Sequence, residues 1–173
     1  KLLKSSNCFM KDKVFNIVIN PNGASGTAKT IFKKIEPLLI KNNIKYIVHT
    51  SSISEGISSI CSRLTKLNED IYLVLIGGDG SLNEAVNGIV NFEKTYVGFI
   101  PCGSGNDFAR SINLPQKLDE LVSIIFKGEV KRTCDIGEVT MHNFSEEFRK
   151  LPDVKDNQFK RKFNVSTGIG FDA

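Results

Sequence analysis

Residues 71–76 are IYLVLI, residues 77–81 follow at once as GGDGS, and residues 82–88 continue as LNEAVNG. Six apolar or aromatic residues without a polar interruption are typical of a strand buried on both faces, as in parallel sheets covered by helices. The glycines that follow would permit positive φ angles and let a ligand approach the bare backbone. Ser81 is placed to cap a helix. The stretch therefore predicts a strand, a glycine turn and a helix.

The start of this predicted helix is suited to an anion. Its unpaired N–H groups and the positive end of its dipole favour a negative ligand, and phosphate is the commonest one. The carboxylate of Asp79 would repel a phosphate unless a divalent cation joined the two, or unless it acted as a base toward a hydroxyl. A tight strand-to-helix connection with an Asx-type hydrogen bond explains the same residues without a ligand. The turn alone therefore does not establish a ligand site.

The composition is that of an ordinary globular protein. Of 173 residues, 40% are hydrophobic and 24% charged, and the formal net charge is +4. This length fits one domain, or one domain plus the beginning of another. No run approaches the roughly 18 apolar residues of a membrane-spanning helix, and the first residues do not resemble a secretory signal. Because the first residue is lysine rather than methionine, we expect a piece of a longer chain.

The cysteines and histidines are not spaced for a metal or disulfide framework. No C-x-x-C pair is present, and the sequence scatters Cys8, Cys61, Cys102, Cys134, His49 and His142 widely. We therefore expect neither zinc nor disulfides, and a reducing cytosol fits best. His49, at the end of a predicted strand, is interpreted as a surface residue.

Two further predicted strands also run into glycine-bearing turns. Residues 14–19 (VFNIVI) lead into NPNGASGT at 20–27, and residues 95–100 (TYVGFI) lead into PCGSGNDFAR at 101–110. The carboxyl ends of parallel strands lie on one edge of an open sheet, so the three turns should converge on one crevice. Since two of them carry an aspartate, the convergence favours a site for nucleotide phosphates and a metal ion. The 20–27 loop is not a Walker A sequence, because no Gly-Lys-Ser/Thr follows its second glycine.

The other periodic segments complete an alternation of strands and helices. The predicted elements are a helix over 29–42 interrupted by Pro37, a strand over 46–50, a helix through Leu67 capped by serines at 51–54, and a helix over 118–126 closed by Gly128.

The pattern changes after residue 128. Alternation over residues 130–136 predicts a half-exposed antiparallel strand. Residues 141–157 are polar and fit a hairpin tip or mobile loop, and residues 161–166 resume a strand. We therefore predict a first domain over residues 14–128 and the start of a second, β-rich domain over residues 129–173.

Taken together, these motifs resemble the diacylglycerol and sphingosine lipid kinase family, in particular its soluble bacterial diacylglycerol kinase-like members. GGDGS with LNEAVNG is similar to the family's GGDGT with a trailing NExxNG, and PCGSGNDFAR is similar to its PxGTxNDFAR. NPNGASG resembles its opening NPxSG loop, and FNVSTGIGFDA at 163–173 resembles the strand where its second domain begins. Ser81 and Ser104 replace the usual threonines, which keeps the hydroxyl.

The resemblance implies an α/β fold related to NAD kinase and phosphofructokinase. It consists of a Rossmann-like parallel-sheet domain followed by a β-rich domain, with ATP between them. Much of the second domain, including the family's acidic base and the acyl-chain pocket, would lie beyond Ala173. We therefore expect this fragment to be inactive alone, because half a cleft cannot fully position and neutralise a phosphoryl group.

Site residues follow from the resemblance by position. Asp79 would be catalytic, as a metal-network ligand or base, and Asp107 and Asp135 would belong to a magnesium site, with an ordinary exposed strand aspartate the alternative for Asp135. Asn83 and Glu84 would either contact the nucleotide or hold the loop. The implied nucleotide-binding residues are Asn20, Gly23, Ser25, Gly26, Thr27, Gly77, Gly78, Gly80, Ser81, Asn83, Glu84, Gly103, Ser104 and Asn106.

The implied activity is transfer of the γ-phosphate of ATP to the hydroxyl of diacylglycerol or a related lipid, with Mg²⁺. The implied partners are ATP, a diacylglycerol-like lipid and a membrane contacted peripherally from the cytoplasm, without nucleic acid. A homodimer is left open. Two alternatives remain: a soluble-substrate kinase of the NAD kinase type, against which the NDFAR stretch argues, and a non-catalytic nucleotide-binding module.

Overall fold

The computed structural model describes residues 13–21, 26–128, 132–142, 154–155 and 158–164. Four parallel strands form the central sheet in the order β2-β1-β3-β4. They are β1 (Val14–Ile19), β2 (Lys45–Thr50), β3 (Ile71–Gly77) and β4 (Thr95–Pro101). The predicted α/β fold with a parallel sheet is thus confirmed, and each of these strands lies within one residue of its predicted bounds.

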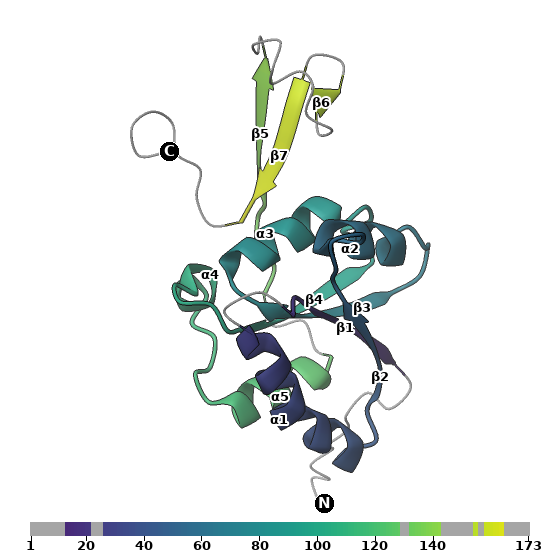
Figure 1. Ribbon diagram of the computed structural model, residues 1–173, viewed down its shortest axis with the longest axis vertical. Coiled ribbons are helices and arrows are strands. Elements are labelled where there is room, and N and C mark those ends of the chain that lie inside the picture. Colours follow the sequence, from purple (N-terminus) through teal and green to yellow (C-terminus); the bar gives the residue numbers. More distant parts are fainter. Residues whose placement is uncertain (1–12, 22–25, 129–131, 143–153, 156–157, 165–173) are drawn as a thin grey trace, which may run out of the picture.

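Helices cover both faces of this sheet. They are α1 (Thr27–Lys41), α2 (Ile57–Thr65), α3 (Asp79–Gly88), α4 (Asp107–Ser111) and α5 (Leu118–Phe126). Figure 1 shows α1 and α5 on one face of the sheet and α2 and α3 on the other. The loops that follow the strands are thereby gathered at the carboxyl edge.

The core explains why β3 lies in the middle of the fold. All seven of its residues are buried, as its unbroken apolar run predicts. Tyr72 and Val74 pack toward α1 and α5, whereas Leu73 and Leu75 pack toward α2 and α3. The strand is therefore held by apolar side chains on both faces, which fixes the position of the turn that follows it.

Pro37 does not interrupt α1, contrary to the sequence prediction. The helix continues from Thr27 to Lys41 with Pro37 inside it. Proline removes one backbone hydrogen bond, but Ile35 before it and Leu39 after it are both buried in the core. Packing on that face holds the helix together across the proline.

The prediction that serines cap α2 is also wrong. The N-cap of α2 is Gly56, without a side-chain hydrogen bond, and the helix ends at Thr65 rather than Leu67. The hydroxyl of Ser52 instead accepts the N–H of Glu55 at 3.1 Å and contacts the Ser54 hydroxyl. These serines stabilise the turn before the helix and not its first residues.

A small antiparallel sheet follows, in the order β5-β7-β6. Its strands are β5 (Gly137–His142), β6 (Val154–Lys155) and β7 (Gln158–Phe163), which Figure 1 shows beyond the layer formed by α2 and α3. The strand predicted over 130–136 is wrong in position, because the described part of it, 132–136, is irregular and the strand begins at Gly137. Gly137 pairs with Phe163, whose ring lies directly over the glycine. A residue that reads as a strand breaker is thus covered by an aromatic ring from the partner strand.

The other predictions for this part are met only partly. The loop predicted over 141–157 includes the end of β5 and all of β6, and its residues 143–153 lie outside the described residues. The strand predicted over 161–166 begins earlier, at Gln158, and residues 165 and 166 are likewise not described. Among the helices of the described residues, none combines the length and apolar character needed to cross a bilayer.

Candidate active site

The turns that follow β3 and β4 meet at the carboxyl edge of the sheet. The N–H of Cys102 donates to the carbonyl of Gly77 at 2.8 Å, just past the last paired residues of the two strands. Beyond this bond the two backbones touch. A β-carbon on Gly103 would lie 2.9 Å from the α-carbon of Gly78. Glycine is therefore required at position 103, and at position 78 a β-carbon would be tightly placed, 3.2 Å from the α-carbon of Gly103.

The glycines of the first turn do not have the positive φ angles that the sequence suggested. The glycines with positive φ among the described residues are Gly26 and Gly128, so Gly77, Gly78 and Gly80 do not supply left-handed backbone. A β-carbon on Gly77 would lie 2.6 Å from the β-carbon of Ser81. Closeness to a neighbour explains Gly77 and Gly78, whereas Gly80 is exposed and has no atom within 4 Å of the place its β-carbon would take.

Ser81 is not the helix cap that the sequence predicts. The helix begins at Asp79 directly after the strand, its N-cap is Gly78, and Ser81 is buried as the third helical residue. The chain passes from strand to helix without the extra residue that a serine cap would need. The first turn of α3 therefore presents Asp79 and Gly80 at the carboxyl edge of the sheet.

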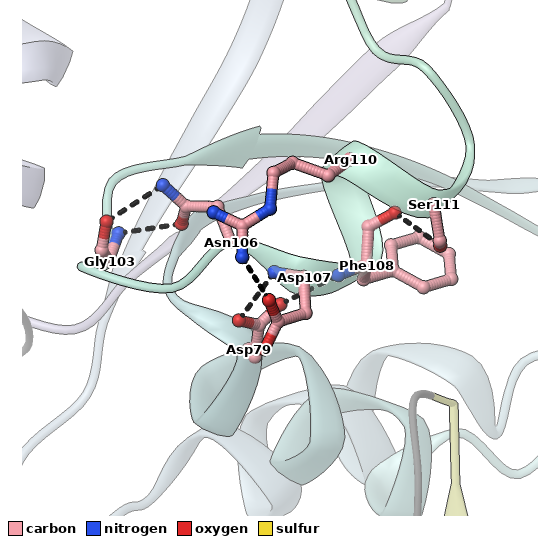
Figure 2. Close-up of polar contacts among 7 residues, drawn as sticks. All are labelled: Asp79, Gly103, Asn106, Asp107, Phe108, Arg110 and Ser111. Carbon is pink, nitrogen blue, oxygen red and sulfur yellow. Dashed lines mark hydrogen bonds and ion pairs between the residues drawn. The ribbon is translucent and has the colours of Figure 1, made fainter.

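The carboxylate of Asp79 joins the two turns. The N–H of Asp107 donates to its Oδ2 at 2.9 Å, and the N–H of Phe108 donates to its Oδ1 at 3.2 Å. Figure 2 shows the side chain reaching from the start of α3 to the first amides of α4. Asp79 thus caps a helix from another segment, and the position of its oxygens is set by both turns.

The second turn is closed by its own asparagine. Asn106 has a left-handed backbone, with a φ of 53°. Its Oδ1 accepts the N–H of Gly103 at 2.9 Å, and its Nδ2 donates to the carbonyl of Gly103 at 2.7 Å (Figure 2). The paired bonds hold Gly103 against Gly78, so Asn106 stabilises the turn that receives Asp79.

Two carboxylates border one point in this turn. A β-carbon on Gly105 would lie 3.3 Å from Oδ2 of Asp79 and 3.5 Å from Oδ2 of Asp107. The exposed guanidinium of Arg110 forms an ion pair with the Asp107 carboxylate, as Figure 2 shows. A glycine at position 105 leaves free the space between the acids.

This donor set fits a magnesium ion that substrate phosphates would share. Mg²⁺ in phosphoryl-transfer sites takes one or two carboxylates together with waters and phosphate oxygens. Each oxygen of Asp79 already accepts one N–H, which leaves a lone pair on each. Among the described residues no group of three or more His, Cys, Asp or Glu side chains is gathered for a metal. Asp79 and Asp107 could therefore supply only part of the coordination.

A cleft of about 750 Å³ lies on the α1 side of the second turn. The predicted residues Ser104 and Asn106 line it, and so do the cations Lys34 and Arg110. Sequence reasoning assigned no role to these two cations. Arg110 stands inside the quoted NDFAR stretch, so its spacing from Asp107 was available as a signal, whereas Lys34 on α1 reaches the cleft only through the packing of the fold.

The first loop reaches the same edge. Ile19 pairs with Ile76, and Ile76 pairs with Ile100, so β1, β3 and β4 end side by side as predicted. Asn20 therefore follows β1 next to the Gly77 turn, while Gly26 is the left-handed N-cap of α1 and Thr27 its first residue. Gly23 and Ser25 lie outside the described residues.

The hydrogen bonds described above between the two turns do not include three of the predicted site residues, which are Asn83, Glu84 and Asp135. Asn83 donates to the carbonyl of Lys162 in β7 at 3.2 Å. Glu84 is exposed on α3. Asp135 is exposed in the irregular segment before β5 and borders a cavity along β4.

The thiol at the base of the second turn is not activated. Cys102 is half-buried, and this burial raises the pKa of its thiol above the ordinary value. A raised pKa leaves less thiolate near neutral pH, so Cys102 is a poor nucleophile.

Residues 15–139, which include both turns, match the family model described as the diacylglycerol kinase catalytic domain. The chain belongs to this diacylglycerol kinase family. The match covers β1 to β4, all five helices and the start of β5, and thus the whole region in which the turns converge.

Relatives of the family agree with this assignment. A diacylglycerol kinase of Staphylococcus carnosus strain TM300 is 33% identical over 132 residues, which are 74% of this chain and 42% of the relative. The protein named "Putative lipid kinase YtlR" of Bacillus subtilis strain 168 is 30% identical over 162 residues, or 90% of this chain and 47% of the relative. A crystal structure of a diacylglycerol kinase from Bacillus anthracis strain Sterne is 25% identical with a TM-score of 0.54, over 74% of this chain and 44% of that one. The chain thus spans less than half the length of these family members.

Proposed function

We propose that the protein is a lipid kinase that transfers the γ-phosphate of ATP to the hydroxyl of diacylglycerol or a related lipid, with Mg²⁺ as the metal. The observation that carries this proposal is the carboxylate of Asp79, which two amides of the second turn hold at the edge of the first turn. Family membership supports the reaction class, since the relatives carry the names of diacylglycerol and lipid kinases.

The first turn is the proposed phosphate cradle. Gly80 is exposed at the start of α3, and the place that a β-carbon on it would take is open space. Helix N-termini bind phosphate through free N–H groups and the helix dipole. Lys34 and Arg110 line the neighbouring cleft and would attract the remaining charge of the triphosphate. Ser104 and Asn106 would form the adjoining wall, and Asn20, Gly26 and Thr27 would approach the nucleotide from the β1 side.

Asp79 is the proposed catalytic residue. Phosphoryl transfer depends mainly on positioning and on neutralising charge, and both oxygens of Asp79 are fixed by hydrogen bonds. The free lone pair on each oxygen would accept a proton from the attacking lipid hydroxyl or bind the metal. Bound Mg²⁺ would neutralise phosphate charge, with Asp107 sharing its coordination. We keep Asp135 as a more distant candidate for the same network.

A lipid substrate lies in a bilayer, so we also propose peripheral contact with a membrane from the cytoplasm. The formal charge of +4 favours weak attraction to anionic lipid.

The experiment uses the full-length natural protein that contains this chain. In Asp79→Asn the side chain keeps an oxygen for one N–H but loses the negative charge. We expect transfer from ATP to diacylglycerol in mixed vesicles to fall about 100- to 10,000-fold, as for loss of a general base or charge stabiliser, while the circular dichroism spectrum is retained. The matched control is Asp70→Asn, an exposed acid just before β3, which should keep parental activity.

Two results would contradict the proposal. Undiminished transfer by Asp79→Asn would remove the catalytic role of this carboxylate. Phosphorylation of NAD in place of lipid by the parent would replace the substrate class.

A further inference from the structure

We propose that Asn87 is a positioning residue that holds the small antiparallel sheet onto the helix carrying Asp79. This inference rests on the proposed lipid kinase function for its consequence, but the contact itself stands on the geometry of α3 and β7. Asn87 lies in the second half of α3, in the stretch LNEAVNG, and none of the site assignments above includes it.

Hydrogen bonds from two asparagines of α3 end on the backbone of Lys162 in β7. The N–H of Lys162 donates to Oδ1 of Asn87 at 2.9 Å, and Nδ2 of Asn87 donates to the carbonyl of Lys162 at 2.9 Å. Nδ2 of Asn83 reaches the same carbonyl at 3.2 Å. The side-chain amide of Asn87 thus pairs with a strand residue as a neighbouring strand would.

The position of Lys162 in its sheet explains why such a partner is needed. On one side Lys162 lies opposite Glu138 of β5. On the other side the described residues of β6 pair with Gln158 and Phe159. The N–H and C=O of one residue in an antiparallel strand point to the same side, and since both groups of Lys162 bond to Asn87 they face away from β5. Asn87 therefore satisfies both backbone groups of Lys162.

Every hydrogen-bonding group of the Asn87 side chain has a partner. Besides the carbonyl of Lys162, Nδ2 donates to the carbonyl of Asn83 one turn earlier in the helix, at 2.9 Å. The two N–H groups and the oxygen of the amide all have partners, and the N–H of Lys162 requires an oxygen opposite it. Aspartate has almost the same shape but no donor, so it would place a negative oxygen against a carbonyl.

Two further contacts fix the ends of this connection. The ammonium of Lys162 lies 4.9 Å from the centre of the Phe92 ring, just past the end of α3. At Gly88, next to Asn87, the helix lies so close to the backbone of Ser58 in α2 that no β-carbon fits. The far end of α3 is therefore held against the main domain, and β7 is tied to a helix that cannot shift freely.

The consequence for the site follows from the length of the helix. Asn87 is eight residues after Asp79, or about 12 Å along the axis at 1.5 Å per residue. Asn87 therefore does not touch the reacting groups. It sets where the second sheet lies relative to the Asp79 carboxylate, and a displacement of about 1 Å at a reacting centre lowers a rate by up to about 100-fold.

The test compares Asn87→Asp with the parent in the full-length natural protein that contains this chain. The matched control is Asn68→Asp, the same chemical change at an exposed turn whose carbonyl, not its side chain, contacts Lys94. Amide hydrogen exchange of residues 158–163 should become faster in Asn87→Asp, while exchange of residues 14–19 stays as in the parent. The kcat for transfer to lipid should fall about tenfold or more with a KM for ATP within about twofold of the parent, because the two glycine turns are intact.

The possible results distinguish failure of the positioning role from failure of the proposed function. Parental exchange in residues 158–163 together with parental kcat in Asn87→Asp would overturn the positioning role and leave the proposed function standing. A parent that transfers nothing to lipid would overturn the proposed function and the positioning role in transfer, whereas faster exchange in the variant would still establish the connection. If Asn87→Asp does not fold, Asn83→Ala is the second variant. It removes the bond from Nδ2 of Asn83 to the carbonyl of Lys162 and the 3.3 Å bond from Nδ2 of Asn87 to Oδ1 of Asn83, but keeps both bonds between Asn87 and Lys162. It should show faster exchange in residues 158–163 and a lower kcat to a smaller extent, and parental values of both would count against the inference.

Discussion

The two glycine turns at the carboxyl edge use the same residue types for different purposes. The turn after β4 is closed internally by the two bonds between Asn106 and Gly103, and it receives the side chain of Asp79. The turn after β3 passes directly into a helix and leaves Gly80 exposed with open space around it. The turn after β4 therefore holds the Asp79 side chain in place, whereas the turn after β3 presents bare backbone at Gly80. The difference indicates that glycine at 78 and 103 serves the fold, whereas glycine at 80 is available for a ligand.

Gly103→Ala should have the largest effect on the folded protein. The new β-carbon would lie 2.9 Å from the α-carbon of Gly78, and backbone atoms cannot move aside as a side chain can. We expect a loss of about 3 kcal/mol in the free energy of unfolding, the upper part of the range for overpacking, together with loss of ATP binding. Urea denaturation measures the unfolding free energy, and calorimetry measures ATP binding. Stability within about 0.5 kcal/mol of the parent would show that the turns do not need this contact.

Asn106→Ala should rank second. It removes two hydrogen bonds and places alanine in a left-handed conformation, so we expect a loss of about 2 kcal/mol in unfolding free energy. Asn106→Gly separates the two causes, because glycine accepts the left-handed backbone but makes no side-chain bond. The glycine variant should recover part of the loss in urea denaturation. Equal losses in both variants would assign the whole effect to the hydrogen bonds.

Gly80→Ala should have a small effect on stability, of opposite sign. A β-carbon at this position meets no atom within 4 Å, and alanine favours the helix that begins there. We expect a gain of about 0.5 kcal/mol in unfolding free energy but about tenfold weaker ATP binding, since the methyl group would enter the proposed phosphate cradle. Calorimetry with ATP and Mg²⁺ checks this result. Unchanged affinity would remove the functional distinction between the two turns.

The smallest expected effect is a difference in labelling rate among the cysteine thiols. Burial raises the pKa of Cys61 to about 12 and also raises the pKa of Cys102, whereas Cys134 is exposed. In a Cys8→Ser background at pH 8, a maleimide should modify Cys134 first, Cys102 more slowly and Cys61 last, because the thiolate is the reacting form. Because the pKa of Cys102 is raised, its labelling rate should keep increasing with pH above the ordinary thiol value. Gly103→Ala should make Cys102 faster, and unchanged labelling would mean that the turns stay closed.

The sequence predicted the elements of the fold that depend on a single periodic pattern. The buried run of β3 and the rule that parallel strands end on one edge predicted the meeting of the two turns. The link between them could not be predicted, because Asp79 bonds to amides of Asp107 and Phe108 that are almost thirty positions away in the chain. The distinct roles of Gly78 and Gly80 also depend on which neighbours the fold supplies.

Local sequence patterns are less informative where distant packing decides the result. Asn83 was predicted either to contact the nucleotide or to hold the loop, and in the structure its side chain bonds to the carbonyl of Lys162 of β7. Its position on α3 was predictable, whereas the strand that meets it comes from a segment seventy-nine residues later. The start of β5 at Gly137 was missed for the same reason, since the ring of Phe163, which fills the place that a β-carbon would take there, comes from a distant strand.

The proposed function requires that both turns serve one phosphate site. The most direct measurement is an NMR titration of the amide groups with ATP and Mg²⁺ in the full-length natural protein that contains this chain. We expect the amides of residues 78–81 and of residues 103–107 to shift together with a common midpoint, and Gly80→Ala to raise this midpoint. Shifts in one turn without the other, or shifts confined to residues outside both, would contradict it.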